Sequence, residues 1–313
     1  WRDWSSDVCS SDLPVEIRLR NAMETGDRLI TGQVMRNVAP VARCISETAA
    51  IPLPPPLPTS ADVLDIPGGT GLTARPSNIR RGVGWGVSMK NLMYSEGFDD
   101  YSTARCRFDN GVVTLKFATA EVGQGFTMLA QQIARTVLGV DEVLLDPIDT
   151  QVGSAGSTSA SRQTWMSGGA VDAACRKVRD LLLDSAAASL GWTRAELEVD
   201  GIDIVDRTTG LRAPVAECGR GVVIDETVEY RHPPTTDLDE NGQGDCHVAF
   251  AFAAHRAVVD VDVELGLVKV VQVATAQDVG RVLNPLSVVG QIEGGIAQGL
   301  GLAVMEEIGR AHV

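Results

Sequence analysis

The sequence predicts an α+β fold in which mixed sheets pack against helices. Apolar and polar residues alternate over 112–117, and this period of two indicates a half-buried strand. Over 126–138 the apolar residues follow helical spacing, and Gly139 is placed to end that helix. Alternating runs at 259–263 and 268–276 predict a strand meander. Because strands and helices interleave without the rhythm of a parallel barrel, we expect mixed sheets.

The composition narrows the classes of partner. A chain of 313 residues with 44% hydrophobic and 22% charged residues can bury a core as one domain or two. Its formal net charge of −14 would repel a nucleic-acid backbone, so we expect no nucleic-acid partner. We find no apolar run of membrane-spanning length and expect no membrane partner. The six cysteines are scattered without a CxxC pair, which argues against an iron–sulfur or structural zinc site in this chain and favours the cytoplasm.

Both ends of the chain look foreign to the fold. One oligonucleotide, read on its two strands, can encode both 308–313 and 7–12, and it resembles a sequencing adapter. We therefore interpret residues 1–13 and 308–313 as non-native tails and give them no functional weight.

The remaining chain is expected to form a connecting segment and two lobes. Residues 14–76 are the connecting segment, and its proline-rich stretch 51–58 can neither pair in a sheet nor continue a helix. The first lobe is expected at 77–224 and the second at 225–307.

Turn residues and periodicity place the other elements. Asp109-Asn110-Gly111 is a strong hairpin signal between two alternating runs. A long helix rich in alanine and leucine is expected at 163–190, closed by Gly191. The further expected elements are a helix at 14–23 and strands at 82–89, 105–108, 143–150 and 248–254.

A glycine-containing loop joins the first strand to its helix. In Glu121-Val-Gly-Gln-Gly125 the two glycines let a ligand approach the backbone closely. The amides of the first helical turn have no partner within the helix, and the helix dipole favours an anion there. Gln124 adds an amide that can both donate and accept. The alternative is a tight turn that binds nothing, since short glycine motifs arise by chance.

A second helix entrance is rich in hydroxyl groups. Residues 153–162 read GSAGSTSASR and lead into the long helix. The hydroxyls nearest the helix belong to Ser157, Thr158, Ser159 and Ser161. Any one of them can cap the helix, but a cap needs only one, and four can line a polyoxygenated ligand. Arg162 is expected either to face a phosphate or to pair with an acid on the surface.

The third entrance opens the last helix. Asn284 is expected as its N-cap and Pro285 as its first residue, with the helix running to Glu307. Five interior glycines each lower helix stability by about 1 kcal/mol relative to alanine. Their spacing leaves one face of the helix without side chains, so another backbone or a flat ligand can lie against it. Gln291 and Gln298 share a face and can hydrogen-bond a heterocycle. The alternative is close helix packing without a ligand.

Taken together, these stretches resemble the molybdopterin-binding large subunit of the xanthine dehydrogenase and aldehyde oxidase family. The resemblance covers nearly all of residues 14–307, and the order and spacing of the motifs make it specific. The matching pieces are EVGQG at 121–125, GSTSASR at 156–162, QDVGRVLNPLSVVGQIEGGIAQGLGLAVMEE at 277–307, LRNAMETGD at 19–27 and GVGWGVSMKN at 82–91.

The resemblance implies a buried pyranopterin whose dithiolene holds molybdenum, so the chain itself supplies no metal ligand. Whether this molybdopterin is the plain form or the cytosine dinucleotide stays open. Enzymes of the family hydroxylate an aldehyde or a heterocycle such as a purine, with water as the oxygen source. Carried over by motif, the cofactor-binding residues are Gly123, Gln124, Gly125, Thr158, Ser159, Ala160, Ser161 and Gln291.

The resemblance also implies partners and a missing base. Electrons leave such enzymes through iron–sulfur clusters and often FAD, which we expect on partner subunits or domains of a hetero-oligomer. The family's general base is a glutamate in a motif that follows the stretch present here, and such a base typically contributes 10²–10⁴-fold in rate. We therefore assign no catalytic residue and expect an internal fragment that is inactive alone.

Two other functions compete with this one. A nicotinamide dehydrogenase needs GxGxxG and an acid about twenty residues further on, and GQGFTM lacks the third glycine. A non-catalytic pterin-binding or cofactor-carrier module fits nearly as well, because the retained motifs bind rather than react. His232, His247 and His255 are not spaced as a metal triad, and we interpret them as structural.

Overall fold

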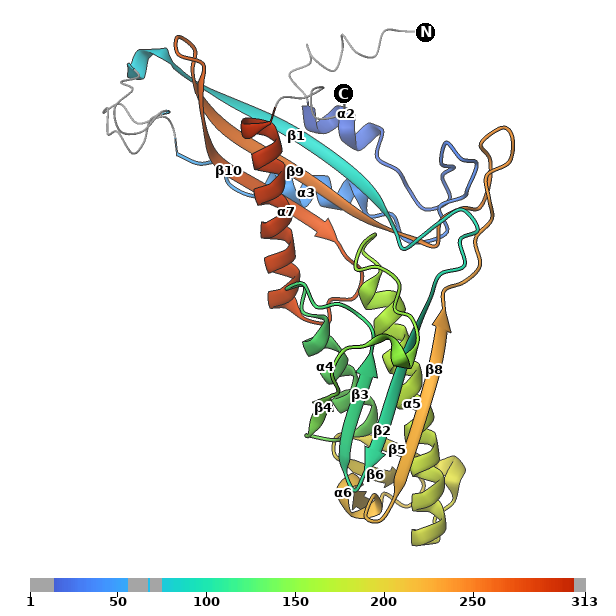
Figure 1. The fold of residues 1–313 in the computed structure, drawn as a ribbon. Coiled ribbons are helices and arrows are strands. Elements are labelled where there is room, and N and C mark those ends of the chain that lie inside the picture. The colour runs from blue at the N-terminus through green and yellow to red at the C-terminus, as the bar shows by residue number, and fades with distance from the viewer. Residues whose placement is uncertain (1–13, 56–66, 68–74, 307–313) are drawn as a thin grey trace. The chain divides into compact units, whose positions relative to one another are not determined.

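The computed structural model describes residues 14–55, 67 and 75–306. The predicted tails and the end of the proline-rich stretch lie outside this part of the chain. The described residues form two compact units, one from those within 1–91 and 249–313 and the other from residues 92–248. Figure 1 gives the order of the elements.

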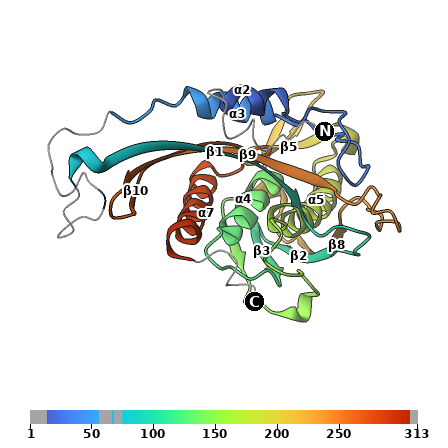
Figure 2. The same ribbon diagram turned by 90° about the horizontal axis from the view of Figure 1, so that it is seen from above.

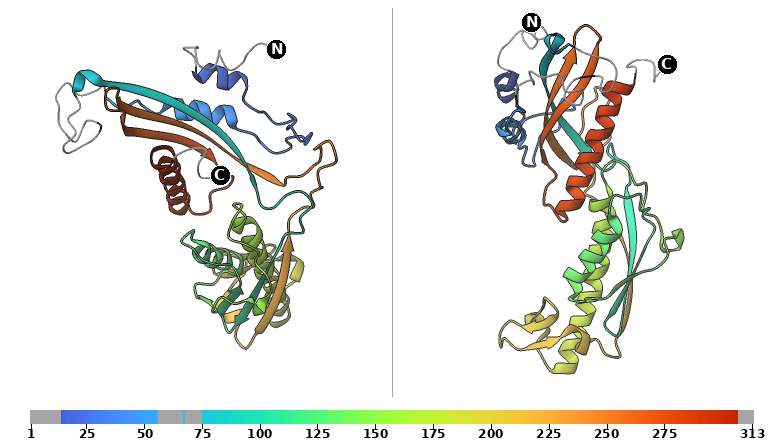
Figure 3. Two further views of the ribbon diagram at one scale, coloured as in Figure 1. Left: turned by 45° about the horizontal axis from the view of Figure 1, so that its top comes forward. Right: turned by 90° about the vertical axis from the view of Figure 1, so that its left-hand side faces the viewer.

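The first unit is built on a three-stranded sheet with the order β1-β9-β10. Helices α2 and α3 lie on one side of this sheet and α7 lies on the other (Figures 2 and 3). A small core packs α3 against the sheet through Ile45 and Phe252. The elements are α2 (Pro14–Arg20), α3 (Val41–Ala50), a 3-10 turn (Pro76–Asn78), β1 (Ile79–Leu92), β9 (Ala249–Asp262), β10 (Leu267–Asp278) and α7 (Pro285–Met305).

Strands β9 and β10 form the predicted meander. They pair antiparallel around a turn in which Gly266 has φ +69°, and a bulge interrupts the register between Val270 and Gln272. The two runs expected at 248–254 and 259–263 belong to one strand. The reason is that burial continues to alternate through His255 and Arg256 without a turn residue.

Helix α7 begins as expected and leaves its surface open. The side chain of Asn284 accepts from the amide of Ser287, and Pro285 is the first helical residue. A Cβ added at any of its five glycines would meet no atom within 4 Å. Among the described helices, α7 alone has the length and composition to cross a membrane, with a mean hydropathy of 1.2, which corrects the expectation that no apolar run reaches that length. Core helices of soluble proteins share this length and composition.

The second unit packs two helices on a four-stranded sheet with the order β4-β3-β2-β8. Helices α4 and α5 cover one face of this sheet (Figure 3). Its core includes Phe108, Leu115 and Val171, all at most 1% exposed. The elements are β2 (Tyr101–Asp109), β3 (Val112–Phe117), α4 (Phe126–Leu138), β4 (Val143–Leu145), a 3-10 turn (Thr150–Val152), α5 (Gln163–Leu190) and β8 (Val223–Arg231).

A smaller antiparallel sheet, ordered β5-β6-β7, follows α5 within the same unit. Its elements are a 3-10 turn (Arg194–Glu196), β5 (Leu197–Asp200), β6 (Asp203–Asp206), β7 (Arg212–Pro214) and the short α6 (Val215–Cys218).

Some predicted bounds are wrong. The strand expected at 143–150 ends at Leu145, because Pro147 has no amide to donate to a ladder. The helix expected at 14–23 ends at Arg20. Packing also differs from the expected lobes, since β8 joins the sheet of β2 while β1 joins that of β9. That residues 77–224 and 225–307 each form a cofactor-binding lobe stays a prediction.

Candidate functional site

Two loops of the second unit meet at one carbonyl oxygen. We call residues 121–125 the glycine loop and residues 154–161 the hydroxyl loop. The hydroxyl of Thr158 donates to the carbonyl oxygen of Ala120 at 3.1 Å, and the side-chain amide of Gln124 donates to the same oxygen at 3.0 Å. The first two predicted motifs therefore lie side by side.

The glycine loop closes on its own acid. One carboxylate oxygen of Glu121 accepts from the amides of Gly123 at 2.9 Å and Gly125 at 3.0 Å. The other oxygen accepts from the amide and the hydroxyl of Thr127 at 3.0 and 3.2 Å. Burial disfavours the ionised form, but these hydrogen bonds outweigh it and lower the pKa of Glu121. The anion expected at these amides is thus the side chain of Glu121 rather than a ligand.

The rest of the glycine loop leaves its backbone accessible. Gln124 uses its side chain locally, because its Oε1 accepts from the amide of Val122 at 2.7 Å. Gly123 and Gly125 have φ +95° and +85°, which disfavours other residues. A Cβ at Gly123 would meet no atom within 4 Å, so a flat ligand has room to lie directly against this backbone.

The hydroxyl loop presents a cluster of oxygen atoms. The Oγ atoms of Ser157 and Ser159 are 2.5 Å apart, and the phenol of Tyr94 hydrogen-bonds to both. These bonds, that to Ser157 first, lower the pKa of Tyr94. No hydroxyl caps α5, whose N-cap residue is Arg162 without a side-chain cap. Ser157 and Ser159 are exposed, which leaves the hydroxyls of this cluster accessible from outside the loop.

Backbone strain accompanies the cluster. Ala160 and Ser161 have φ +53° and +51°, in the left-handed region that residues other than glycine rarely adopt. The carbonyl oxygen of Ala160 accepts from the amide of Met93 at 2.8 Å, which ties this turn to the segment that precedes β2. The conformation therefore depends on contacts from outside the loop.

Three residues of the site were not predictable from the sequence. Tyr94 and Asp100 lie in a segment without a motif, and their partners lie about sixty residues further along the chain. Gln163 donates to the carbonyl of Ser157 at 3.0 Å and to the hydroxyl of Thr158 at 3.1 Å. The sequence did contain a signal for the role of Glu121, since acidic residues are favoured near helix N-termini.

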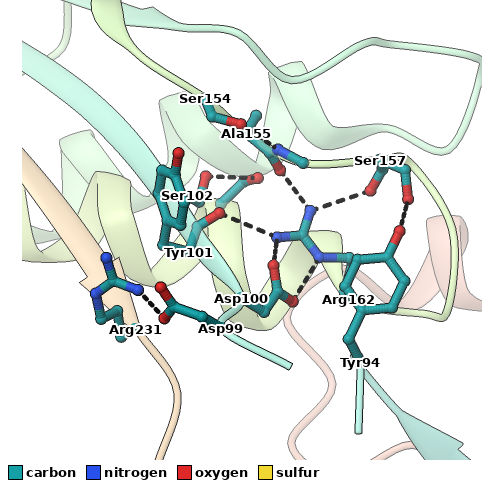
Figure 4. A network of polar contacts seen from close by, with 12 residues as sticks. Tyr94, Asp99, Asp100, Tyr101, Ser102, Ser154, Ala155, Ser157, Arg162 and Arg231 are labelled. Carbon is teal, nitrogen blue, oxygen red and sulfur yellow. Dashed lines mark hydrogen bonds and ion pairs between the residues drawn. The ribbon is translucent and has the colours of Figure 1, made fainter. Parts of the chain in front are cut away.

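Arg162 takes the second of its two expected roles, with one correction. It pairs with an acid, Asp100, but the pair is buried rather than on the surface (Figure 4). Their side chains are 0% and 3% exposed.

One predicted cofactor residue, Gln291, belongs to the other compact unit. It is an exposed residue of α7, and its place in the site stays a prediction. The described residues hold no cluster of three or more His, Cys, Asp or Glu side chains that could bind a metal ion.

A family model for the molybdopterin cofactor-binding domain matches residues 71–311. The chain belongs to this family. The match confirms the resemblance to molybdenum-binding subunits of the xanthine dehydrogenase and aldehyde oxidase type, and it identifies the chain as a molybdopterin-binding domain.

Relatives with curated names include subunits of a hydroxylase and of an oxidoreductase. The nicotine 6-hydroxylase large subunit of Paenarthrobacter nicotinovorans is 29% identical over 69% of this chain and 28% of its own length. The aldehyde oxidoreductase molybdenum-binding subunit PaoC of Escherichia coli K12 is 27% identical over 94% of this chain and 36% of its own length. The chain thus spans about a third of such relatives.

Solved structures share the fold. Quinoline 2-oxidoreductase of Pseudomonas putida 86 superposes with a TM-score of 0.69 over 92% of this chain and 37% of its own, at 22% identity. The aldehyde oxidoreductase of Desulfovibrio desulfuricans gives 0.67 over 92% of this chain and 28% of its own, at 23% identity. The expected α+β class is confirmed.

Proposed function

We propose that this chain holds molybdopterin at its glycine and hydroxyl loops and serves the large subunit of a molybdenum hydroxylase. One observation carries the proposal: Thr158 and Gln124, from two predicted cofactor motifs, donate to the same carbonyl oxygen, that of Ala120. Loops joined in this way can present their backbone and hydroxyl groups to one ligand.

The exposed groups of the two loops fit a pterin. The open backbone at Gly123 suits the face of a flat ring, and the hydroxyls of Ser157 and Ser159 suit ring nitrogen and oxygen atoms that both donate and accept. We expect Gln291 to add an amide from α7. A metal at this site would be held by the pterin's own sulfur atoms.

The chain's residues bind and orient the cofactor rather than move protons. When bound, the cofactor supplies a molybdenum centre whose redox change supports hydroxylation of an aldehyde or a purine-like heterocycle with water as the oxygen source. The two acids that hydrogen-bond within the site, Glu121 and Asp100, are both engaged by protein groups. We therefore assign neither as the base and propose that the chain alone, as a fragment without the catalytic glutamate, is inactive.

Partners follow from the same proposal. Relatives are named as a large subunit, a large chain and the gamma subunit of a complex. We propose a cytoplasmic hetero-oligomer in which other subunits or domains carry iron–sulfur clusters and FAD. The cofactor can be plain molybdopterin or its cytosine dinucleotide.

Copurification tests the proposal. The chain is expressed in a host that makes molybdopterin and in a matched host that cannot, and bound pterin is measured as its fluorescent oxidation product. We expect near-stoichiometric pterin from the first host only, and no turnover of aldehydes or purines above the pterin-free preparation. A chain without pterin from the first host would contradict the binding role, and turnover would contradict the inactivity.

A cofactor carrier is the second candidate, favoured by the engagement of Glu121 and Asp100 in hydrogen bonds. A carrier releases its pterin to a cofactor-free molybdenum enzyme. Restoration of that enzyme's activity by the loaded chain would favour the carrier, whereas retention of the pterin would favour the subunit role.

A further inference from the structure

We propose that Arg162, paired with Asp100, is a positioning residue that shapes the hydroxyl loop from within and does not bind the cofactor. The binding part of the test below rests on the proposed function.

All five N–H groups of Arg162 have acceptors within the protein (Figure 4). Nε donates to one carboxylate oxygen of Asp100 at 2.9 Å, and Nη2 donates to the other. Nη2 also donates to the carbonyl of Tyr101 at 3.3 Å. Nη1 donates to the carbonyls of Ala155 and, at 3.0 Å, of Ser157. No donor is left for a phosphate, and no surface of the side chain reaches solvent.

The carbonyls that Arg162 collects determine which groups the loop presents. Those of Ala155 and Ser157 turn inward to the guanidinium, while the hydroxyl of Ser157 is free to meet Ser159 and Tyr94. The Tyr94 ring lies over the guanidinium at 5.6 Å from its centroid, a cation–π distance. The same cation therefore supports the hydroxyl cluster from two directions.

Gly156 agrees with this arrangement. Its φ is +62°, and an added Cβ would lie 2.7 Å from Nη1 of Arg162. A side chain at position 156 would therefore clash with the guanidinium, around which the loop closes. Asp100 neutralises the cation, so the loop carries no unpaired positive charge toward a ligand.

The two roles for Arg162 predict opposite effects of Asp100→Asn. If Arg162 were a phosphate ligand, loss of its internal acid would free it and tighten pterin binding. As a positioning residue it loses its orientation, and we expect pterin to bind about tenfold more weakly. Asp172→Asn is the matched control, because Asp172 pairs with Arg176 at 2.7 Å on the exposed face of α5.

Arg162→Lys separates charge from shape. Lysine keeps the cation but cannot reach three carbonyls and a carboxylate with a planar fork. We expect about tenfold weaker binding from this variant and unchanged binding from Arg176→Lys. Wild-type binding by Arg162→Lys would overturn the proposal.

A second readout needs no cofactor. Tyrosinate absorbance is titrated and assigned to Tyr94 with Tyr94→Phe. Displacement of the hydroxyl loop removes the bonds from Ser157 and Ser159, so the pKa of Tyr94 should rise toward its ordinary value in Arg162→Lys. The double variant Asp100→Asn with Arg162→Gln buries no charge, and it serves if a single variant fails to fold.

The outcomes are distinguishable. A wild-type chain that binds no pterin contradicts the proposed function, while a raised Tyr94 pKa in the variants still supports positioning. An unmoved Tyr94 titration in folded variants overturns the positioning role, as does tighter pterin binding by Asp100→Asn.

Discussion

At the scale of single residues, each loop is organised by a charged side chain of its own. Glu121 collects the amides of the glycine loop, and Arg162 collects the carbonyls of the hydroxyl loop. Hydrogen bonds to charged groups contribute more than neutral ones, about 1.5–3 kcal/mol each. Both loops are therefore held in shape by groups already present in the chain.

Glu121→Gln tests the first of these groups. The pKa of Glu121 is lower in the folded chain than in the unfolded chain, where it is about 4.3. The ionised carboxylate therefore contributes its full stabilisation above the unfolded-state pKa. That stabilisation is lost as the pH falls through the folded-state pKa. We expect Glu121→Gln to lower the free energy of unfolding by about 1–2 kcal/mol at pH 7, with a difference that shrinks below about pH 4. Urea unfolding at several pH values measures this.

The exposed Glu142 supplies the control, since Glu142→Gln should change little at any pH. A loss of unfolding free energy in Glu121→Gln that stayed constant down to pH 3 would contradict the assignment. Such a loss would not depend on the ionisation of the Glu121 carboxylate.

The sequence predicts residue types at this scale better than it predicts their partners. The glycines, the hydroxyls and an acid partner for Arg162 follow from local motifs. Asp100 and Tyr94 do not, because they come from a segment about sixty residues earlier in the chain and reach the hydroxyl loop only through the fold.

At the scale of elements, helices with end signals were predicted to the residue. Helices α4 and α5 begin at Phe126 and Gln163 as expected and end before Gly139 and Gly191. Strand lengths were less predictable. Pairing partners extend β9 and β1 beyond their apolar patterns, and Pro147 prevents β4 from continuing.

The two C-capping glycines make a matched pair. Both have positive φ, +66° at Gly139 and +70° at Gly191, but a Cβ at Gly139 would lie 2.3 Å from the carbonyl oxygen of Gly201. The site at Gly191 is open. We expect Gly191→Ala to cost about 1 kcal/mol and Gly139→Ala to cost about 2 kcal/mol more, because the packed backbone must move.

Thermal or urea unfolding of the two variants measures the difference. Equal losses would show that the turn of β5 and β6 does not press on the end of α4.

At the scale of the whole chain, the described residues form two hydrophobic cores from different segments. The first joins α3 to strands β9 and β10, more than two hundred residues later, and the second lies between the β2 sheet and its helices. The pairing of β1 with β9 was not predictable from the sequence, since no local pattern shows it.

Separate cores predict separate responses to truncation. Ile45→Ala removes a fully buried side chain from the first core and should lower the stability of β9 amides by about 2–5 kcal/mol. Amides of α5 should be unaffected, and Leu182→Ala should give the reverse pattern. Native-state hydrogen exchange reads both units in one experiment. Equal losses throughout the chain would mean that the two units unfold together.

The central claim is that one pterin rests on both joined loops, and Thr158→Val tests it most directly. The substitution keeps the shape of the side chain but removes its bonds with Ala120 and Gln163. Thr136→Val, which removes a hydroxyl bond on the exposed surface of α4, is the control. The measurement is the dissociation constant for pterin. We predict about tenfold weaker binding by Thr158→Val and unchanged binding by Thr136→Val. Equal affinity of the two variants would contradict the claim.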